Sequence, residues 1–255
     1  MAELIFLTLS TTELIFFTLS LVYIIAAWLW TNAGSINDSP LPPFTHLDPF
    51  EIAALRDGRK GVIYTALFKL WNSKLLTLSG KGHKATIYRT NNALTRQPEG
   101  FEKTIFHFVY KPRQPVDFFR DTALRKSVDR YFESINQKLE KRQLKRTDSQ
   151  MKQAQKAFWI TLFILIGTGC IFCYFDMGCL SILAIMIILS VIVLKPKKMT
   201  WRGRRYYKKL IQYFEGLKSV DNFDPAIPIA VYGVRDLSYF DGYAPFKYAF
   251  DAKIF

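Results

Sequence analysis

Three uncharged apolar stretches constrain the fold of this chain more than any other feature of its sequence. They run over Leu14–Trp30, Ala157–Phe175 and Met177–Leu194. A helix rises about 1.5 Å per residue, so roughly 20 apolar residues cross the hydrocarbon core of a bilayer, which is about 30 Å thick. Only Asp176 separates the last two stretches, so we expect them to form a tight helical hairpin. The sequence therefore predicts an α-helical membrane protein with three transmembrane helices, one N-terminal anchor plus a hairpin.

The positions of Lys and Arg predict the orientation of these spans. Seven lie in the twenty residues before the second stretch and eight in the twenty residues after the third, whereas the hairpin tip and the N-terminal segment hold none. Basic flanks stay on the cytoplasmic side of a membrane. We therefore expect residues 31–156 and 195–255 in the cytoplasm and the N-terminus outside. Four tryptophans near the inner interface fit an aromatic belt: Trp28, Trp30, Trp159 and Trp201.

The net charge of +14 is concentrated beside the spans. Residues 111–156 carry thirteen Lys and Arg against six acids, and residues 195–218 carry nine against one. Topology and attraction to anionic lipid, worth about 1 kcal/mol per basic residue near the surface, explain this excess. Nucleic-acid binding is the alternative explanation of the same charge. The residues that we expect to contact anionic headgroups are Lys195, Lys197, Lys198, Arg202, Arg204, Arg205, Lys208 and Lys209.

The cytoplasmic part opens with a strong helix signal. Asp48 is a natural N-cap, Pro49 suits the first helical position, and Glu51 stands three residues after the cap, which predicts a capping box. Gly58 can end this short helix. A second helix follows over residues 59–72, with apolar side chains at helical spacing.

A β-hairpin is expected next, because two short β-prone runs flank the Gly-containing turn Ser79–Lys84. The order helix, helix, hairpin is that of the second half of a winged-helix domain, with Lys81, His83 and Lys84 at the tip of the wing. Such a domain can place its wing and second helix on DNA, or it can serve protein contact. The second helix would expose only a thin basic face, so we favour protein contact.

The remaining cytoplasmic segments are less regular in pattern. Residues 91–115 are expected to be irregular, and a long helix is expected to start near Pro115 and to continue towards the second span. After the third span, Arg204–Lys218 reads as a basic amphipathic helix that lies on the inner leaflet or docks on the cytoplasmic domain. Its expected apolar stripe is Leu210, Tyr213, Phe214 and Leu217.

The C-terminal tail is unusually aromatic for a solvated segment. A second cap signal, Asp224-Pro225, precedes it. Large aromatic side chains gain stability when they are packed, so the tail either packs on the rest of the protein or docks a partner. The candidate partner-binding residues are Tyr239, Phe240, Tyr243, Phe246, Tyr248 and Phe250.

Composition and pattern divide the chain into six segments. Residues 32–46 are rich in Asn, Ser, Gly and Pro and read as a linker. The segments are the N-terminal transmembrane anchor 1–31, the linker 32–46, the winged-helix-like domain 47–110, the long basic helix 111–156, the transmembrane hairpin 157–194, and the amphipathic helix with aromatic tail 195–255.

The sequence holds no recognisable catalytic or metal-binding pattern. Its three histidines, His46, His83 and His107, lack ligand spacing, and no metalloprotease, hydrolase or P-loop string occurs. Cys170-x-x-Cys173 lies within a span, where small apolar packing is the favoured interpretation. We therefore expect no enzyme activity, no cofactor and no metal.

The segment Leu47–Gly58 resembles a family of uncharacterised bacterial membrane proteins from actinobacteria and cyanobacteria. That family carries an N-terminal span followed by the pattern L-D-P-[FY]-E-[IV]-A-x-L-x-x-G, which this segment matches. Residues 226–234 are similar to a segment of a related predicted-membrane family. The resemblance implies the bacterial plasma membrane, or the thylakoid membrane in a cyanobacterium, and it implies no catalytic residue. The Gly/Cys-rich tail of many members is missing here.

Three functions remain open at the level of sequence. The leading hypothesis is a non-enzymatic membrane protein that binds a protein partner as an accessory or assembly subunit of a membrane complex. The second is a membrane-tethered nucleic-acid-binding regulator. The third is a transporter component, which the lack of charges inside the last two spans disfavours.

Overall fold

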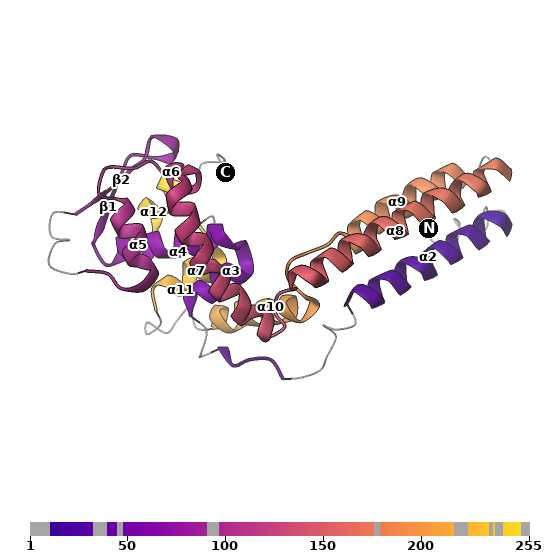
Figure 1. The fold of residues 1–255 in the computed structure, drawn as a ribbon, viewed down its shortest axis with the longest axis horizontal. Coiled ribbons are helices and arrows are strands. Elements are labelled where there is room, and N and C mark those ends of the chain that lie inside the picture. The colour runs from indigo at the N-terminus through magenta and orange to yellow at the C-terminus, as the bar shows by residue number, and fades with distance from the viewer. Residues whose placement is uncertain are drawn as a thin grey trace. The chain divides into compact units, whose positions relative to one another are not determined.

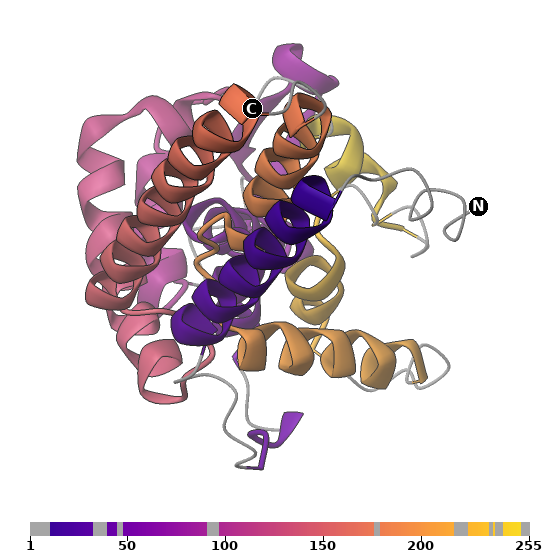
Figure 2. The same cartoon turned by 90° about the vertical axis from the view of Figure 1, so that its right-hand side faces the viewer.

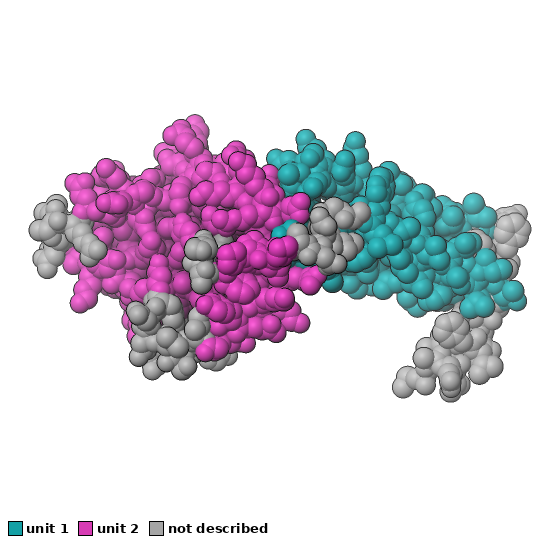
Figure 3. Space-filling model, turned by 90° about the horizontal axis from the view of Figure 1, so that it is seen from below, with its two compact units in different colours: residues 1–39, 145–202 teal, residues 40–144, 203–255 magenta. Residues whose placement is uncertain are grey.

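The computed structural model describes residues 11–32, 40–44, 48–90, 97–175, 179–216, 224–234, 237 and 242–250. The described chain is mostly helical, with one two-stranded sheet (Figure 1). It forms two compact units, coloured separately in Figure 3. Unit 1 comprises residues 1–39 and 145–202, and unit 2 comprises residues 40–144 and 203–255.

Unit 1 consists of three apolar helices that lie side by side (Figures 1 and 2). Of these, α2 and α8 are long and apolar enough to cross a membrane, whereas the 16 residues of α9 form a shorter apolar helix. Asp176 and Met177, at the expected hairpin tip, lie outside the described residues. The helices are α2 (Thr11–Asn32), α8 (Asp148–Phe175) and α9 (Cys179–Leu194).

The three helices of unit 1 pack through a narrow inner face. Phe16 of α2, Leu165 of α8 and Met186 of α9 are buried there together. Gly169 lets α8 approach α9, because a Cβ atom at this position would lie 2.4 Å from Leu183 Cδ1. Small residues that allow close approach are typical of helix packing in membranes.

The central helix of unit 2 is α4. Its residues from Gly61 to Phe68 are all buried, and so is Leu70. This burial on every side explains why the helix carries so many apolar residues. α4 spans Arg59–Asn72. The helices that contact it are α3 (Pro49–Asp57), α5 (Gly100–Phe108), α7 (Thr122–Lys141) and α11 (Ala226–Tyr232).

Both ends of α3 follow the sequence signals. The Phe50 N–H donates a hydrogen bond of 3.1 Å to Asp48 Oδ1, and Pro49 is the first helical residue. Gly58 ends the helix with a φ of +64°, a conformation that glycine adopts without a steric penalty. The predicted N-cap and the predicted helix end are confirmed.

Glu51 does not complete the predicted capping box. Its side chain is 6% exposed, and its Oε2 lies 2.7 Å from Arg142 Nη1, with Lys138 also nearby. The second half of the capping-box prediction is therefore wrong. A buried carboxylate needs a charged, hydrogen-bonded partner, and α7 supplies one that the local sequence does not reveal.

Replacing Asp48 by alanine should destabilise unit 2 by about 1 kcal/mol, the usual cost of losing an N-cap. The measurement is thermal or denaturant unfolding of the full-length protein in detergent. The exposed residue Glu133 provides a control, since Glu133→Ala should change stability little. An unchanged unfolding midpoint for Asp48→Ala, together with lost partner binding, would instead give the carboxylate a functional role.

The predicted β-hairpin is present. Strand β1 (Leu76–Ser79) pairs antiparallel with β2 (Thr86–Arg89), with Leu76 opposite Arg89 and Ser79 opposite Thr86. The turn between them contains the short 3-10 segment Gly82–Lys84. Lys81 and Lys84 are exposed at this tip, as the sequence predicts.

The segment after the hairpin is more helical than predicted. Residues 100–108, expected to be irregular, form α5, in which Phe101 and Ile105 are buried. The expected long helix is divided into α6 (Asp117–Arg120) and α7, and it does not continue into the second span, because α7 ends at Lys141 and α8 starts at Asp148. Asp121 causes the first division, since its side chain caps α7 through the Leu124 N–H.

The helix after the third span buries a different stripe from the predicted one. In α10 (Trp201–Gly216) the buried side chains are Tyr206, Leu210 and Phe214, whereas Tyr213 is 39% exposed. Leu217 lies outside the described residues. Within unit 2, the ring of Phe44 contacts that of Tyr206, with centroids 5.2 Å apart, so this helix docks on protein rather than presenting its apolar face to a leaflet.

Candidate functional site

The outer surface of unit 1 is apolar on all three helices. Trp30 and Phe163 are each 72% exposed, and Ile192 is 65% exposed. Only 22% of the α2 span and 28% of the α8 span are buried within the protein. Exposed apolar surfaces of this size mark a site of contact with a protein or a membrane.

Basic side chains gather at one end of this apolar unit, where α8 begins and α9 ends. The first nine residues of α8 precede its apolar stretch, and two of their lysines are exposed. Three more exposed lysines follow α9. We call this set the basic collar: Lys152, Lys156, Lys195, Lys197 and Lys198.

The collar end of unit 1 is held together by Arg146. Its guanidinium donates to the Thr31 carbonyl at 3.2 Å and to Asn32 Oδ1 at 2.9 Å, which caps the C-terminus of α2. Its backbone N–H bonds to the Lys198 carbonyl at 2.9 Å. From the sequence, Arg146 is only one of the basic residues that predict topology. In the structure it stands just before α8 and bonds to the end of α2 and to the segment after α9.

Tryptophans lie at the same end of unit 1. Trp28 contacts Trp201 edge-on, with ring centroids 5.8 Å apart. Trp30 and Trp159 are exposed, the latter by 55%. Aromatic rings beside basic residues are typical of a membrane–water interface.

The eight predicted lipid-contact residues are divided between the two units. Lys195, Lys197 and Lys198 are exposed in unit 1. On α10 the exposed members are Arg205, Lys208 and Lys209, which follow one another at helical spacing opposite the buried stripe. Arg202 and Arg204 are only partly exposed, so they contribute less to a cationic surface.

The described part of the aromatic tail is packed on the protein. Helix α12 (Ala244–Phe250) buries Phe246 and Phe250, and the ring of Phe246 lies 5.2 Å from that of Phe68 on α4. Tyr243 also contacts Phe68. Phe246 and Phe250 are therefore core residues in this conformation, whereas Tyr243 is partly exposed and Tyr248 is 52% exposed. Tyr239 and Phe240 lie outside the described residues.

Hydrogen bonds hold both ends of α11, the helix that precedes the aromatic tail. The Ala226 N–H donates to Asp224 Oδ1 at 2.8 Å, as the predicted cap requires. At the other end of α11, Arg56 Nη1 donates to the carbonyls of Ile229 and Ala230 at 2.8 and 2.9 Å. The C-terminal segment is therefore anchored to α3 by polar contacts as well as to α4 by aromatic ones.

The helix that a winged-helix protein would use on DNA is not accessible here. Gly61 to Phe68 of α4 are buried under neighbouring helices. Of its basic residues, Arg59 pairs with Asp129 at 2.8 Å and Lys69 pairs with Glu102 at 2.6 Å. α4 could enter a DNA groove only after its covering helices had moved away.

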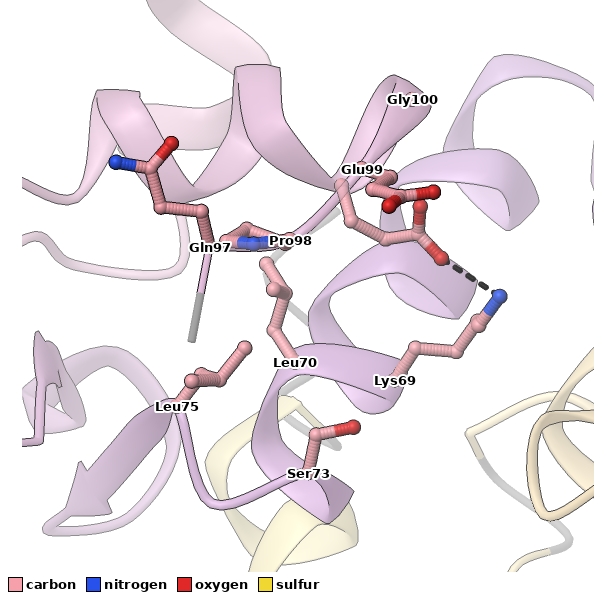
Figure 4. Close-up of a pocket in the computed structure, with 9 residues that line it drawn as sticks. Lys69, Leu70, Ser73, Leu75, Gln97, Pro98, Glu99 and Gly100 are labelled. Carbon is pink, nitrogen blue, oxygen red and sulfur yellow. Dashed lines mark ion pairs between the residues drawn. The ribbon is translucent and has the colours of Figure 1, made fainter. Parts of the chain in front are cut away.

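One pocket of about 610 Å³ lies in unit 2 between the end of α4 and the start of α5 (Figure 4). Three charged residues line it: Lys69, Glu99 and Glu102. Lys69 and Glu102 form the ion pair that the dashed line marks. Burial alone would lower the pKa of Lys69, but the hydrogen bond and charge of Glu102 outweigh it and raise that pKa. The pair carries no net charge, and Glu99 is the remaining charged residue of the pocket lining.

Two tyrosines of unit 2 have clearly raised pKa values. Burial raises the pKa of Tyr131 and of Tyr206 to about 12, so both phenols stay protonated at physiological pH. Within the part of the chain that the structure describes, no group of three or more His, Cys, Asp or Glu side chains could hold a metal ion.

Comparisons with protein-family models, with curated proteins and with solved structures give no match to this chain.

Proposed function

We propose that this chain is a non-enzymatic integral membrane protein with three spans. The observation that carries the proposal is the apolar outer surface of α2, α8 and α9, which ends at the basic collar and its tryptophans. Lipid would cover the apolar surface, and anionic headgroups would neutralise the collar, at about 1 kcal/mol per basic residue. On this proposal α9 forms the third span.

The proposal places unit 2 in the cytoplasm as a protein-binding module. The basic flanks of α8 and α9 support that side of the membrane. Exposed tyrosines with nearby lysines support a protein partner, since interfaces are enriched in Tyr. Lys81 lies 5.1 Å from the ring centre of Tyr248, and Lys111 lies 5.4 Å from that of Tyr110. An accessory or assembly subunit of a bacterial membrane complex fits these features.

Cysteine labelling in intact cells tests the topology. Single cysteines in a background without the three native ones should react with a membrane-impermeant reagent at residues 2 and 177, and should not react at residues 84 and 208. Lys84 and Lys208 are both exposed in the structure, so failure to label them reports the membrane and not burial. Labelling at residue 84 from outside would contradict the proposed orientation.

Co-purification in mild detergent tests the partner. We expect the double variant Tyr110→Ala/Tyr248→Ala to lose a stoichiometric partner that the wild type retains, because both rings are exposed. Lys126→Ala, at an exposed position of α7, is the matched control and should retain the partner. If both variants retain it, the tyrosines are not the contact.

A membrane-tethered nucleic-acid-binding regulator is the second candidate, and the exposed lysines of the hairpin tip and α7 support it only through charge. Such binding would fall steeply with salt, because each neutralised phosphate releases counterions. DNA retention by the reconstituted protein that falls steeply between about 50 and 200 mM salt would favour this candidate over the first.

A further inference from the structure

Two helices of unit 2 end in the same backbone motif. After α4, Ser73 has a φ of −76°, Lys74 has a φ of +59°, and the N–H of Leu75 bonds to the Leu70 carbonyl at 2.9 Å. This is a left-handed helix end, in which the chain turns sharply and then continues as a strand.

The end of α7 repeats this geometry position by position. Arg142 has a φ of −81°, Gln143 has a φ of +58°, and the N–H of Leu144 bonds to the Leu139 carbonyl at 2.9 Å. Among the residues that the structure describes, Lys74 and Gln143 are the non-glycine residues with positive φ. Both following leucines, Leu75 and Leu144, are buried.

The helices before these two ends are also arranged alike. A short helix, α3, joins α4 directly at Gly58, and a short helix, α6, joins α7 directly at Asp121. In each case the second helix is the longer one. α4 is buried continuously from Gly61 to Phe68, whereas α7 buries one stripe that includes Val128 and Phe132.

After each of the two left-handed helix ends, the chain pairs antiparallel with a later segment. After the first, β1 pairs with β2 across a turn of six residues, 80–85. After the second, Lys145 pairs with Met199, and the N–H of Arg146 bonds to the Lys198 carbonyl at 2.9 Å. The residues between this second pair include α8 and α9.

We infer that residues 117–200 are a second copy of the module in residues 49–89, with the apolar hairpin of α8 and α9 in place of the first copy's turn. The chain leaves unit 2 after Leu144 and returns to it at Gly203, and the paired residues between these points keep the two ends together. A loop whose ends are already paired is where a protein tolerates an insertion. Unit 2 should therefore fold without the hairpin. This inference does not depend on whether the hairpin crosses a membrane.

Excision of the hairpin tests the inference. Residues 147–197 are replaced by Asn-Gly, which favours a two-residue turn, so that Arg146 and Lys198 still flank it. We expect the two segments of unit 2, residues 40–144 and 203–255, to resist limited proteolysis as they do in the wild type, with an unfolding midpoint within a few degrees. Degradation of unit 2 in the excised protein would show that the hairpin belongs to its fold, and would overturn the inference.

A second test uses the full-length protein in detergent. If the two helix ends are equivalent, Lys74→Gly and Gln143→Gly should each raise the unfolding midpoint by about 2–4 °C, because glycine adopts positive φ without strain. Ser73→Gly, at a negative φ one residue earlier, is the control and should not raise it. Shifts of opposite sign at positions 74 and 143 would show that the two ends are not copies.

Discussion

Deleting residues 237–255 should leave the protein in the membrane but make unit 2 sensitive to protease. The deletion removes Phe246 and Phe250, which are 0% and 3% exposed, and uncovers Phe68 on the central helix. Losing one buried phenylalanine costs about 3–5 kcal/mol, whereas a whole domain is stable by only about 5–15 kcal/mol. The deletion should therefore remove most of the stability of unit 2, while the three apolar helices remain.

Limited proteolysis of membranes that contain the truncated protein measures this effect. Phe246→Ala should reproduce a large part of it, and Tyr248→Ala, at a position 52% exposed on the same helix, is the matched control that should not. A truncated protein that keeps the wild-type protease pattern would show that the tail is dispensable for the fold.

Replacing Gly61 by valine should also prevent normal folding of unit 2. A Cβ atom at this position would lie 2.4 Å from the Ala53 carbonyl oxygen and 3.0 Å from the Ala53 carbonyl carbon. These are backbone atoms of α3, so α3 and α4 would have to separate. Overpacking alone costs about 1–3 kcal/mol, and a clash with backbone should place this variant at or above the top of that range.

Denaturant unfolding of the detergent-solubilised protein checks the Gly61→Val variant. Gly216→Val is the control, because a Cβ atom at Gly216 meets nothing within 4 Å. Equal stability of the two variants would mean that α3 and α4 do not pack as closely as described.

Local signals in the sequence predict the local structure well. Asp48-Pro49 and Asp224-Pro225 both mark helix starts, and their carboxylates accept the expected backbone hydrogen bonds. The hairpin turn at 79–84 and the three apolar helices were predictable as well, because their signals are also local in the sequence. Each depends on residues close together in the chain.

Features that depend on distant residues were not predictable. Glu51 has the spacing of a capping box, but Arg142, at the end of α7, forms an ion pair with it. The stripe of α10 includes Tyr206 because the ring of Phe44, which precedes it by more than 160 positions, contacts it. A single helical pattern fits several faces, and tertiary packing selects one of them.

Some misses had a signal that could have been read. Phe101 and Ile105 are spaced as on one helical face, which would have indicated α5. The break after α7 had a weaker signal, since Gln143 carries no preference for positive φ. Leu139 and Leu144 have the same spacing in the sequence as Leu70 and Leu75. The structure shows that each pair is joined by the backbone hydrogen bond that ends a helix.

Spin labelling of the apolar helices in reconstituted bilayers tests the central claim, that unit 1 lies in lipid. Nitroxides replace Phe163 on α8 and Ile188 on α9, which are 72% and 60% exposed, and Lys126 in unit 2 as a control. We predict that positions 163 and 188 collide readily with oxygen and are shielded from a water-soluble nickel complex, whereas position 126 is open to the nickel complex. Nickel access at 163 and 188 equal to that at 126 would contradict a membrane location for these helices.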